Sequence, residues 1–160
     1  MTTRKTMTME RTFEASLDDV WALWTTKDGI ESWWGPEGFA AEVHEIDVRV
    51  GGTMAYDMVA VAPEMVAFMK KAGMPVSQPC RFTYTDVVAK KRLAWRQDVD
   101  FVPGVTPYDV ATSVELFEES GRVRMVMTLE AMHDAEWTKR AAAGWEQQLG
   151  KLARVIGGKR

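Results

Sequence analysis

Four polar side chains fall at alternating positions of expected strands that would turn them toward the protein interior. They are Tyr56, Tyr84, Gln97 and Thr112. A few polar groups in an apolar pocket can fix the orientation of a ligand. They can equally satisfy one another or hold a buried water. The pattern therefore indicates an apolar interior with polar tips, and it leaves the function of these tips open.

The acidic residues near these positions do not form a catalytic pair in the sequence. Asp57, Asp98 and Asp100 have the opposite strand parity and are expected to face solvent. This placement argues against a mechanism in which two carboxylates act as general acid and base. The alternation breaks at residues 87–88, so the orientation of two further acids stays open: Asp86 and Glu130.

Nucleophilic and metal-based chemistry have little support in the sequence. His44 and His133 are the only histidines and are expected at the surface or in turns, so a metal centre would need carboxylate ligands. Cys80, the only cysteine, begins an expected strand and is interpreted as a small inward hydrophobe. The sequence contains no serine nucleophile elbow and no cysteine–histidine pair with an orienting acid. We assign no catalytic residue, metal or cofactor. Whether the protein is an enzyme stays open, and the residues favour a protein without catalytic activity.

Composition narrows the class of protein. The chain of 160 residues is expected to form one domain over residues 1–160. A formal net charge of −3 argues against nucleic acid as a partner. The first ten residues lack an apolar signal core, and no apolar run approaches the ~18 residues of a membrane span. We therefore expect a cytoplasmic protein that is monomeric or homodimeric. The unusual feature of its composition is the presence of 11 Met and 7 Trp residues in a chain of this length.

Strand-like alternation occupies most of the chain and must position the polar tips. The expected strands are 6–15, 39–49, 53–61, 80–88, 92–101, 108–118 and 122–132. Short turns between most of them predict antiparallel neighbours. Two short helices are expected after the first strand, at 16–25 and 28–33. A long amphipathic helix is expected at 135–156, where apolar residues recur every three or four positions.

These elements predict an α+β helix-grip fold, in which a curved seven-stranded antiparallel sheet wraps a long C-terminal helix. A sheet curved over one helix is expected to leave a cavity lined by inward side chains. In the final helix, Gly144 is expected to permit close approach of a strand or of Trp34, and Trp145 to serve as core, as cavity wall or as both. Of the pair Trp33–Trp34, one indole is expected to face inward and the other to seat the short helices.

Several motifs in the same order resemble one known family. They are 11–15 (RTFEA), 20–21 (VW), 24–25 (WT), 33–36 (WWGP), 47–52 (DVRVGG), 144–145 (GW), Leu149 and Leu152. Together they resemble the bacterial proteins similar to the C-terminal domain of the activator of the heat-shock chaperone ATPase, the AHSA1-like family. The resemblance implies membership of the START-related (SRPBCC, birch-pollen-allergen-like) helix-grip superfamily, which includes polyketide cyclases and lipid carriers. Because this fold hosts carriers, enzymes and cochaperone modules, the resemblance implies a fold rather than one activity.

The segment 62–79 departs from the family pattern, which has a short hairpin turn there. Pro63 can begin a helix and the sequence 73–75 (GMP) can end one, so a helical insertion is expected. Met65, Phe68 and Met69 share one helical face, with Lys70 and Lys71 opposite. We expect this face to cover the cavity mouth as a lid, fixed or mobile.

Three functions are compatible with this sequence. The leading one is binding of a small hydrophobic, aromatic molecule between the sheet and the final helix. The alternatives are a cyclase- or hydrolase-like enzyme using tyrosine and acidic residues in that cavity, and a chaperone-associated or regulatory interaction module of the kind associated with stress responses. The expected ligand-binding residues are Trp33, Trp34, Met54, Tyr56, Met58, Phe68, Met69, Phe82, Tyr84, Trp95, Gln97, Met125, Met127, Trp145 and Leu149.

Overall fold

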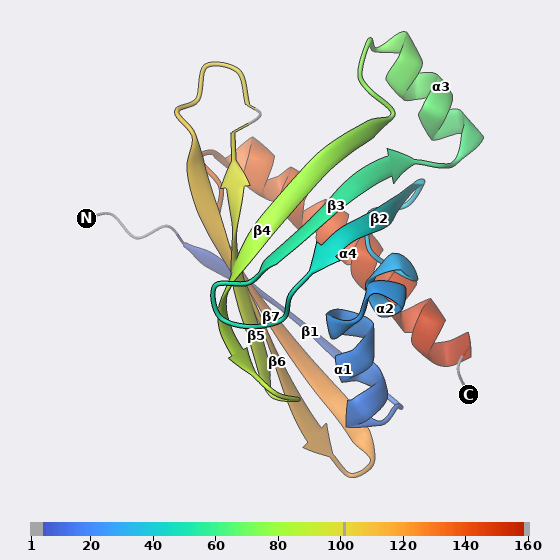
Figure 1. Cartoon of the computed structure of the whole chain (residues 1–160), viewed down its shortest axis with the longest axis vertical. Helices are drawn as coiled ribbons and strands as arrows, with labels where there is room; N and C mark the ends of the chain where they lie inside the picture. Colours follow the sequence, from blue (N-terminus) through green and yellow to red (C-terminus); the bar gives the residue numbers. More distant parts are fainter. Residues whose placement is uncertain (1–4, 101, 159–160) are drawn as a thin grey trace.

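A curved antiparallel sheet carries helices on one side (Figure 1) in the computed structural model, which describes residues 5–100 and 102–158. The sheet has seven strands in the order β1-β7-β6-β5-β4-β3-β2 and is not closed into a barrel. Its strands are β1 Thr6–Phe13, β2 Phe39–Ile46, β3 Thr53–Ala60, β4 Ser77–Val88, β5 Arg92–Val99, β6 Tyr108–Glu119 and β7 Arg122–Glu130. The predicted seven-stranded helix-grip fold is confirmed. Phe101, with which the expected fifth strand ends, lies outside the described residues.

Two irregularities bend the sheet and explain where the sequence pattern breaks. The register shifts in β2 between Val43 and Glu45, and again in β4 between Tyr84 and Asp86. A bulge of this kind inserts one residue, so the strand bends and the alternation of faces resets. Tyr84 consequently faces the interior, whereas Asp86 faces outward and its carboxylate accepts a hydrogen bond of 2.8 Å from Arg92. The interruption at 87–88 in the sequence follows directly from this bulge.

The turn between β2 and β3 depends on two glycines. Gly51 has a φ of 86°, in the left-handed region that glycine adopts without strain. Gly52 is required for space, since a Cβ there would lie 2.0 Å from the carbonyl oxygen of Asp47. The side chain of Arg49 donates a 2.8 Å hydrogen bond to the Asp47 carboxylate, which fixes the turn rather than forming a ligand site.

Two short helices, α1 (Leu17–Thr25) and α2 (Lys27–Glu31), close one end of the curved sheet. Each begins at a hydroxyl side chain that accepts a backbone hydrogen bond. Ser16 accepts from the N–H of Asp19, and Thr26 accepts from the N–H of Gly29, both at 3.0 Å. These caps satisfy N–H groups that a helix start leaves free. Trp33 and Trp34 follow α2 in the chain and are buried against the sheet.

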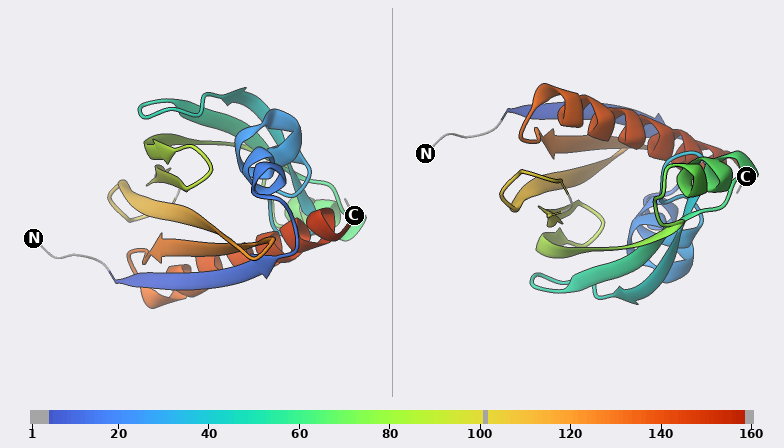
Figure 2. Two further views of the ribbon diagram at one scale, coloured as in Figure 1. Left: turned by 90° about the horizontal axis from the view of Figure 1, so that it is seen from below. Right: turned by 90° about the horizontal axis from the view of Figure 1, so that it is seen from above.

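The long helix α4 (Ala135–Gly158) crosses the concave face of the sheet (Figure 2). It begins where β7 ends, with its first turn capped by the Asp134 carboxylate, which accepts from the N–H of Trp137 at 2.8 Å. It ends beside α1 and α2 (Figures 1 and 2). Among the described residues, no helix combines the length and the apolar character needed to cross a membrane.

The helix in the insertion, α3 (Pro63–Lys71), projects from the ends of β3 and β4, away from α1 and α2 (Figure 1). It begins at the expected Pro63 and ends at Lys71, before the expected stop signal at 73–75. The segment after it turns back at Gly73, which has a φ of 71°, and β4 starts at Ser77, three residues before the expected position.

Candidate functional site

One continuous aromatic cluster fills the deep space between the sheet and α4. Ring centroids lie 4.7 Å apart for Trp24 and Trp33, 5.3 Å for Trp34 and Trp145, and 5.0 Å for Phe82 and Trp95. These separations are those of edge-to-face and stacked aromatic pairs. Tyr56 and Tyr84 extend the cluster along the sheet. Most of the space that the sequence predicts as a cavity is therefore occupied by the protein's own rings.

The indole rings of Trp33 and Trp34 were expected to have different positions, one facing inward and one seating the short helices, but both are buried in the core. Trp33 is completely buried and Trp34 is 3% exposed, and both belong to the aromatic cluster. The indole N–H of Trp33 donates a 2.8 Å hydrogen bond to the carbonyl of Leu23, which anchors it to α1. Trp34 instead contacts Tyr56 and Trp145. Both tryptophans are core residues in this conformation.

The predicted ligand-binding residues separate into a sealed group and a partly exposed group. The sealed group is Trp33, Trp34, Met54, Tyr56, Met69, Phe82, Tyr84, Trp95, Met125, Met127 and Leu149. Met58, Gln97 and Trp145 keep partial exposure and point toward the space between the sheet and α4. Phe68 belongs to neither group, because it faces solvent on α3.

Tyr56 is the central polar group of the sheet's concave face. Its hydroxyl lies close to the side chains of Trp34, Cys80 and Gln97. Complete burial raises the pKa of Tyr56, and burial together with the nearby Asp47 carboxylate raises the pKa of Tyr84. Both phenols therefore stay protonated at neutral pH and can donate hydrogen bonds, but they do not supply a phenolate base or nucleophile.

Cys80 faces the same space beside Tyr56. Burial raises the pKa of its thiol, which disfavours the reactive thiolate. The expectation of an inward, hydrophobe-like cysteine agrees with this partly buried position opposite Tyr56 in the β3–β4 pair.

The C-terminal half of α4 is sealed against the core. Leu149 and Leu152 are completely buried and Ile156 is 5% exposed. The polar side chains of this half bind the 35–39 loop from the side. Gln148 Oε1 accepts from the N–H of Gly35 at 3.1 Å, and Gln147 Oε1 accepts from the N–H of Glu37 at 3.0 Å. Lys151 Nζ donates to the carbonyls of Gly35 and Phe39 at 3.0 and 2.9 Å. Arg154 forms an ion pair with Glu37.

The N-terminal half of the same helix does not seal against the sheet. Trp137, Ala141, Ala142 and Trp145 are only partly buried. A Cβ at Gly144 would meet nothing within 4 Å. The expectation that Gly144 permits a close approach is therefore wrong, because open space lies beside this glycine.

The concave face of the sheet also has partly exposed side chains, at the edge where β3 and β5 end and β4 and β6 begin. Met58, Cys80, Gln97 and Val110 lie there on the concave face and keep partial exposure. β7 ends at the same edge and leads directly into α4. We call this region the open end; its walls are Met58, Cys80, Gln97 and Val110 on the sheet and Trp137, Ala141, Gly144 and Trp145 on α4.

The insertion helix does not place its predicted face over the open end. Phe68 is 61% exposed, whereas Met69 is 6% exposed, so the two residues do not act together. Met65 packs against Gly38, whose Cβ would lie 3.3 Å from that side chain. The predicted orientation of the face formed by Met65, Phe68 and Met69 is wrong, because α3 packs against the 35–39 loop and leaves Phe68 in solvent.

The acids and histidines lie mostly on the outer surface. Asp57 pairs with exposed His44 at 3.0 Å, and Asp98 and Asp100 are exposed, as their parity predicts. Glu130 accepts from the N–H of Ala111 at 3.1 Å on the outer face. Tyr108 is not marked by any pattern in the sequence, and its hydroxyl lies 2.6 Å from Nδ1 of His133, in the segment between β7 and α4. Only the contact between distant strands reveals that pair.

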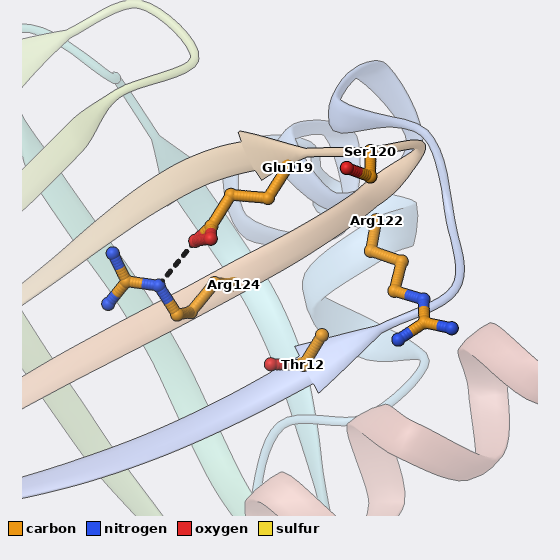
Figure 3. A pocket seen from close by; sticks show the side chains of 5 residues that line it. All are labelled: Thr12, Glu119, Ser120, Arg122 and Arg124. Carbon is orange, nitrogen blue, oxygen red and sulfur yellow. Dashed lines mark hydrogen bonds and ion pairs between the residues drawn. The ribbon is translucent and has the colours of Figure 1, made fainter.

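Two surface hollows are formed by other residues, and the second lies at the same edge of the sheet as the open end. One, of about 420 Å³, is lined by Thr12, Glu119, Ser120, Arg122 and Arg124 (Figure 3). Its arginines are engaged, since Arg124 binds Glu119 at 2.5 Å and Arg122 pairs with Glu14 at 3.5 Å. The other, of about 280 Å³, is lined by acidic residues around Tyr108. Neither combines apolar walls with convergent polar groups as ligand sites do.

Comparison with known proteins identifies the family. A family model described as "Activator of Hsp90 ATPase homolog 1-like protein" matches residues 14–157. The chain therefore belongs to this family, and the resemblance noted in the sequence is confirmed. Comparison with curated proteins gives no match.

Solved structures support the same fold. The chain is similar to protein CV1439 of Chromobacterium violaceum, with 24% identity, a TM-score of 0.76, and coverage of 94% of this chain and 96% of that one. It is similar to the AHSA1 protein of Silicibacter pomeroyi, with 18% identity, a TM-score of 0.76, and coverage of 98% and 100%. It is also similar to an AHSA1-like protein of Aeromonas hydrophila, with 20% identity, a TM-score of 0.70, and coverage of 97% and 94%. At these identities the likeness establishes the fold alone.

Proposed function

We propose that this protein binds a small hydrophobic, aromatic molecule at the open end. The observation that carries the proposal is the contrast in burial along α4. Inward-facing residues of both walls stay partly exposed there, whereas the other half of the helix is sealed. A ligand that covers these apolar surfaces would remove them from water, which is the main favourable contribution to apolar binding.

The composition of the open end favours a flat, apolar ligand. Trp145 and Trp137 contribute aromatic rings from α4, and Met58 contributes a flexible thioether from β3. Aromatic rings favour stacked or edge-to-face contacts with other rings. A methionine side chain adapts its shape to the occupant. Gln97 and the Tyr56 hydroxyl behind it supply a small number of polar groups that could orient the ligand.

The two alternatives have less support. An enzyme using tyrosine and an acid would need an ionisable pair in the open end, but Tyr56 stays protonated and the acids described above face outward. An interaction module would use the exposed apolar residues around α3, which are Val61, Phe68 and Met74. These residues lie outside the open end, and the proposed function does not involve them.

Filling the space beside Gly144 tests the proposal. Binding of 2-acetylnaphthalene is measured by isothermal titration calorimetry for the wild type, for Gly144→Leu and for the matched control Gly150→Leu on the same helix. Gly144→Leu should lower the affinity at least tenfold, because its side chain would occupy the proposed ligand space. Gly150→Leu should leave the affinity unchanged, since a Cβ there meets only the flexible end of Arg154 at 4.0 Å.

Thermal melts of the same variants separate blocked binding from misfolding. Both substitutions replace a glycine within a helix, which should stabilise the fold by about 0.5–1 kcal/mol where the new side chain meets no clash. Absence of binding by the wild type, or wild-type affinity in Gly144→Leu, would show that the open end is not the site.

A further inference from the structure

Exposed apolar side chains are concentrated in the inserted segment around α3. Six large hydrophobic side chains are exposed in the part of the chain that the structure describes, and three of the six, Val61, Phe68 and Met74, lie within residues 61–74. Single exposed hydrophobic residues are common on protein surfaces, but their concentration on one segment indicates an interaction surface. The inserted segment therefore carries apolar surface that the folding of this chain does not bury.

The C-terminal end of α3 combines two of these side chains with two lysines. Lys71 follows Phe68 by three residues, which places both on one side of the helix. Lys70 and Lys71 are exposed. The N–H of Met74 donates to the carbonyl of Met69 at 2.9 Å, so Met74 directly follows the last turn of the helix. We call Phe68, Lys70, Lys71 and Met74 the α3 tip.

The α3 tip is basic, although the whole chain has a formal net charge of −3. Neither of its lysines forms an ion pair with another described residue. The acidic residue of this helix, Glu64, lies in the first turn, at the other end. A second pair of adjacent lysines, Lys90 and Lys91, lies between β4 and β5, but there Lys90 is bound to Asp18 at 2.6 Å. The tip thus presents positive charge that no neighbouring carboxylate compensates.

The position of the α3 tip favours a bilayer over a protein as its partner. α3 projects from the body of the molecule, and its C-terminal end points away from the sheet (Figure 1). A specific protein interface takes about 800 Å² and roughly 20–30 residues from each partner, which this projecting end does not offer. A bilayer surface requires no matching shape. It accepts apolar side chains at the acyl boundary and lysines among the headgroups.

We infer that the α3 tip docks this protein on an anionic lipid bilayer, with Phe68 and Met74 entering the acyl boundary and with Lys70 and Lys71 at the lipid phosphates. Burial of the two apolar side chains and attraction of the two lysines to the anionic surface act together. α3 joins β3 to β4 at the sheet edge that also carries the open end. Docking requires no ligand there, so the inference does not depend on the proposed function.

Co-sedimentation with vesicles tests the role of the lysines at about 0.15 M salt, because lower ionic strength exaggerates surface electrostatics. The wild type should bind vesicles of equal parts phosphatidylcholine and phosphatidylglycerol at least tenfold more tightly than vesicles of phosphatidylcholine alone. Each lysine near an anionic surface contributes about fivefold. The double variant Lys70→Gln/Lys71→Gln should therefore lose at least tenfold on the mixed vesicles. The matched control Lys90→Gln/Lys91→Gln should bind as the wild type does.

The same assay tests the apolar contribution with two exposed phenylalanines. Phe68→Ala should weaken binding to the mixed vesicles by about fivefold or more, since its ring would leave the acyl boundary. Phe117→Ala, which truncates the other exposed phenylalanine, should not weaken it. Thermal melts of each variant verify that the fold is retained.

A fluorescent label reports whether the tip enters the bilayer. A nitrobenzoxadiazole dye is attached to Met74→Cys in a Cys80→Ser background, and to Val88→Cys in the same background as the control. The two positions are matched in exposure, at 45% and 43%. The dye at residue 74 should brighten and shift to shorter wavelength when mixed vesicles are added, and the dye at residue 88 should not.

Each outcome decides a separate point. Failure of the wild type to bind the mixed vesicles overturns the inference and leaves the proposed function untouched, because these measurements contain no ligand. Equal losses in the two lysine pairs show that overall charge drives binding and overturn the assignment to the α3 tip. Binding without a response of the dye at residue 74 overturns the docking in a bilayer, and an acidic protein surface then becomes the partner that fits the tip.

Discussion

The two halves of α4 differ in what surrounds them, although one continuous helix forms both. The C-terminal half buries Leu149, Leu152 and Ile156 and binds the 35–39 loop through four polar side chains. The N-terminal half carries two large rings, Trp137 and Trp145, and leaves both of them partly exposed. Apolar character alone therefore does not decide burial. What decides it is whether a loop and a second layer cover the helix from the side.

The largest expected effect compares one residue from each half. Leu152→Ala should lower the free energy of unfolding by about 2–5 kcal/mol, because it leaves a cavity in a sealed core. Trp137→Ala removes a larger side chain but should cost no more than about 1.5 kcal/mol, since that ring is partly exposed. Urea denaturation of both variants measures the difference. A larger loss for Trp137→Ala would refute the division of α4 into an anchored and an open half.

The same contrast recurs at smaller scale on α3, where neighbouring residues differ in burial. Met69→Ala should lower the free energy of unfolding by about 2 kcal/mol, at the low end for truncation of a buried methionine. Phe68→Ala should change it by less than about 0.5 kcal/mol, as for an exposed position. Thermal and urea denaturation of the pair provide the measurement. Equal losses would show that Phe68 is packed in solution, and weaker binding of 2-acetylnaphthalene to Phe68→Ala would restore the lid hypothesis.

The smallest expected effect concerns pH and the contacts between the C-terminal half of α4 and the 35–39 loop. The hydrogen bond from Arg154 holds the pKa of Glu37 below its usual value. Stability from a carboxylate with a lowered pKa is present above the unfolded-state value, near pH 4.5, and is lost as the pH falls through the folded-state value. Glu37→Gln should therefore be slightly less stable than the wild type at pH 7, and this difference should shrink at pH 3. A difference that grows on acidification would contradict the pairing.

The sequence was sufficient to predict the architecture because periodicity is a local property. Alternation over 39–132 and the apolar stripe of the final helix predicted the strands, their antiparallel pairing with neighbours and the helix that crosses the sheet, but not the pairing of β1 with β7. Strand parity also placed Asp57, Asp98 and Asp100 on the outer face correctly. The break at 87–88 was visible as an irregularity, but its cause, a bulge at Tyr84–Asp86, required the pairing with β5.

The details of the candidate site depend on contacts that periodicity does not contain. The spacing of Met65, Phe68 and Met69 correctly predicts a helix. Which of these residues are buried depends on how that helix packs against the 35–39 loop. A Cβ at Gly144 would meet nothing within 4 Å, and the spacing of residues in α4 does not reveal this open space. The side-chain contact between Gln148 and the N–H of Gly35 joins residues 113 positions apart, so no local pattern in the sequence could predict it.

The pairing of β1 with β7 has a consequence for the rate of folding. Thr6 lies opposite Glu130, and the register continues to Phe13 opposite Val123, so five other strands separate the first strand from its partner in the sequence. Pairings between residues so distant in sequence carry a large loop-closure entropy, and chains dominated by them fold slowly, in milliseconds to seconds. Until β7 arrives, β1 presents an unpaired edge with Met7 and Met9, which is a template for intermolecular pairing. Early refolding intermediates of this protein should accordingly be its most aggregation-prone species.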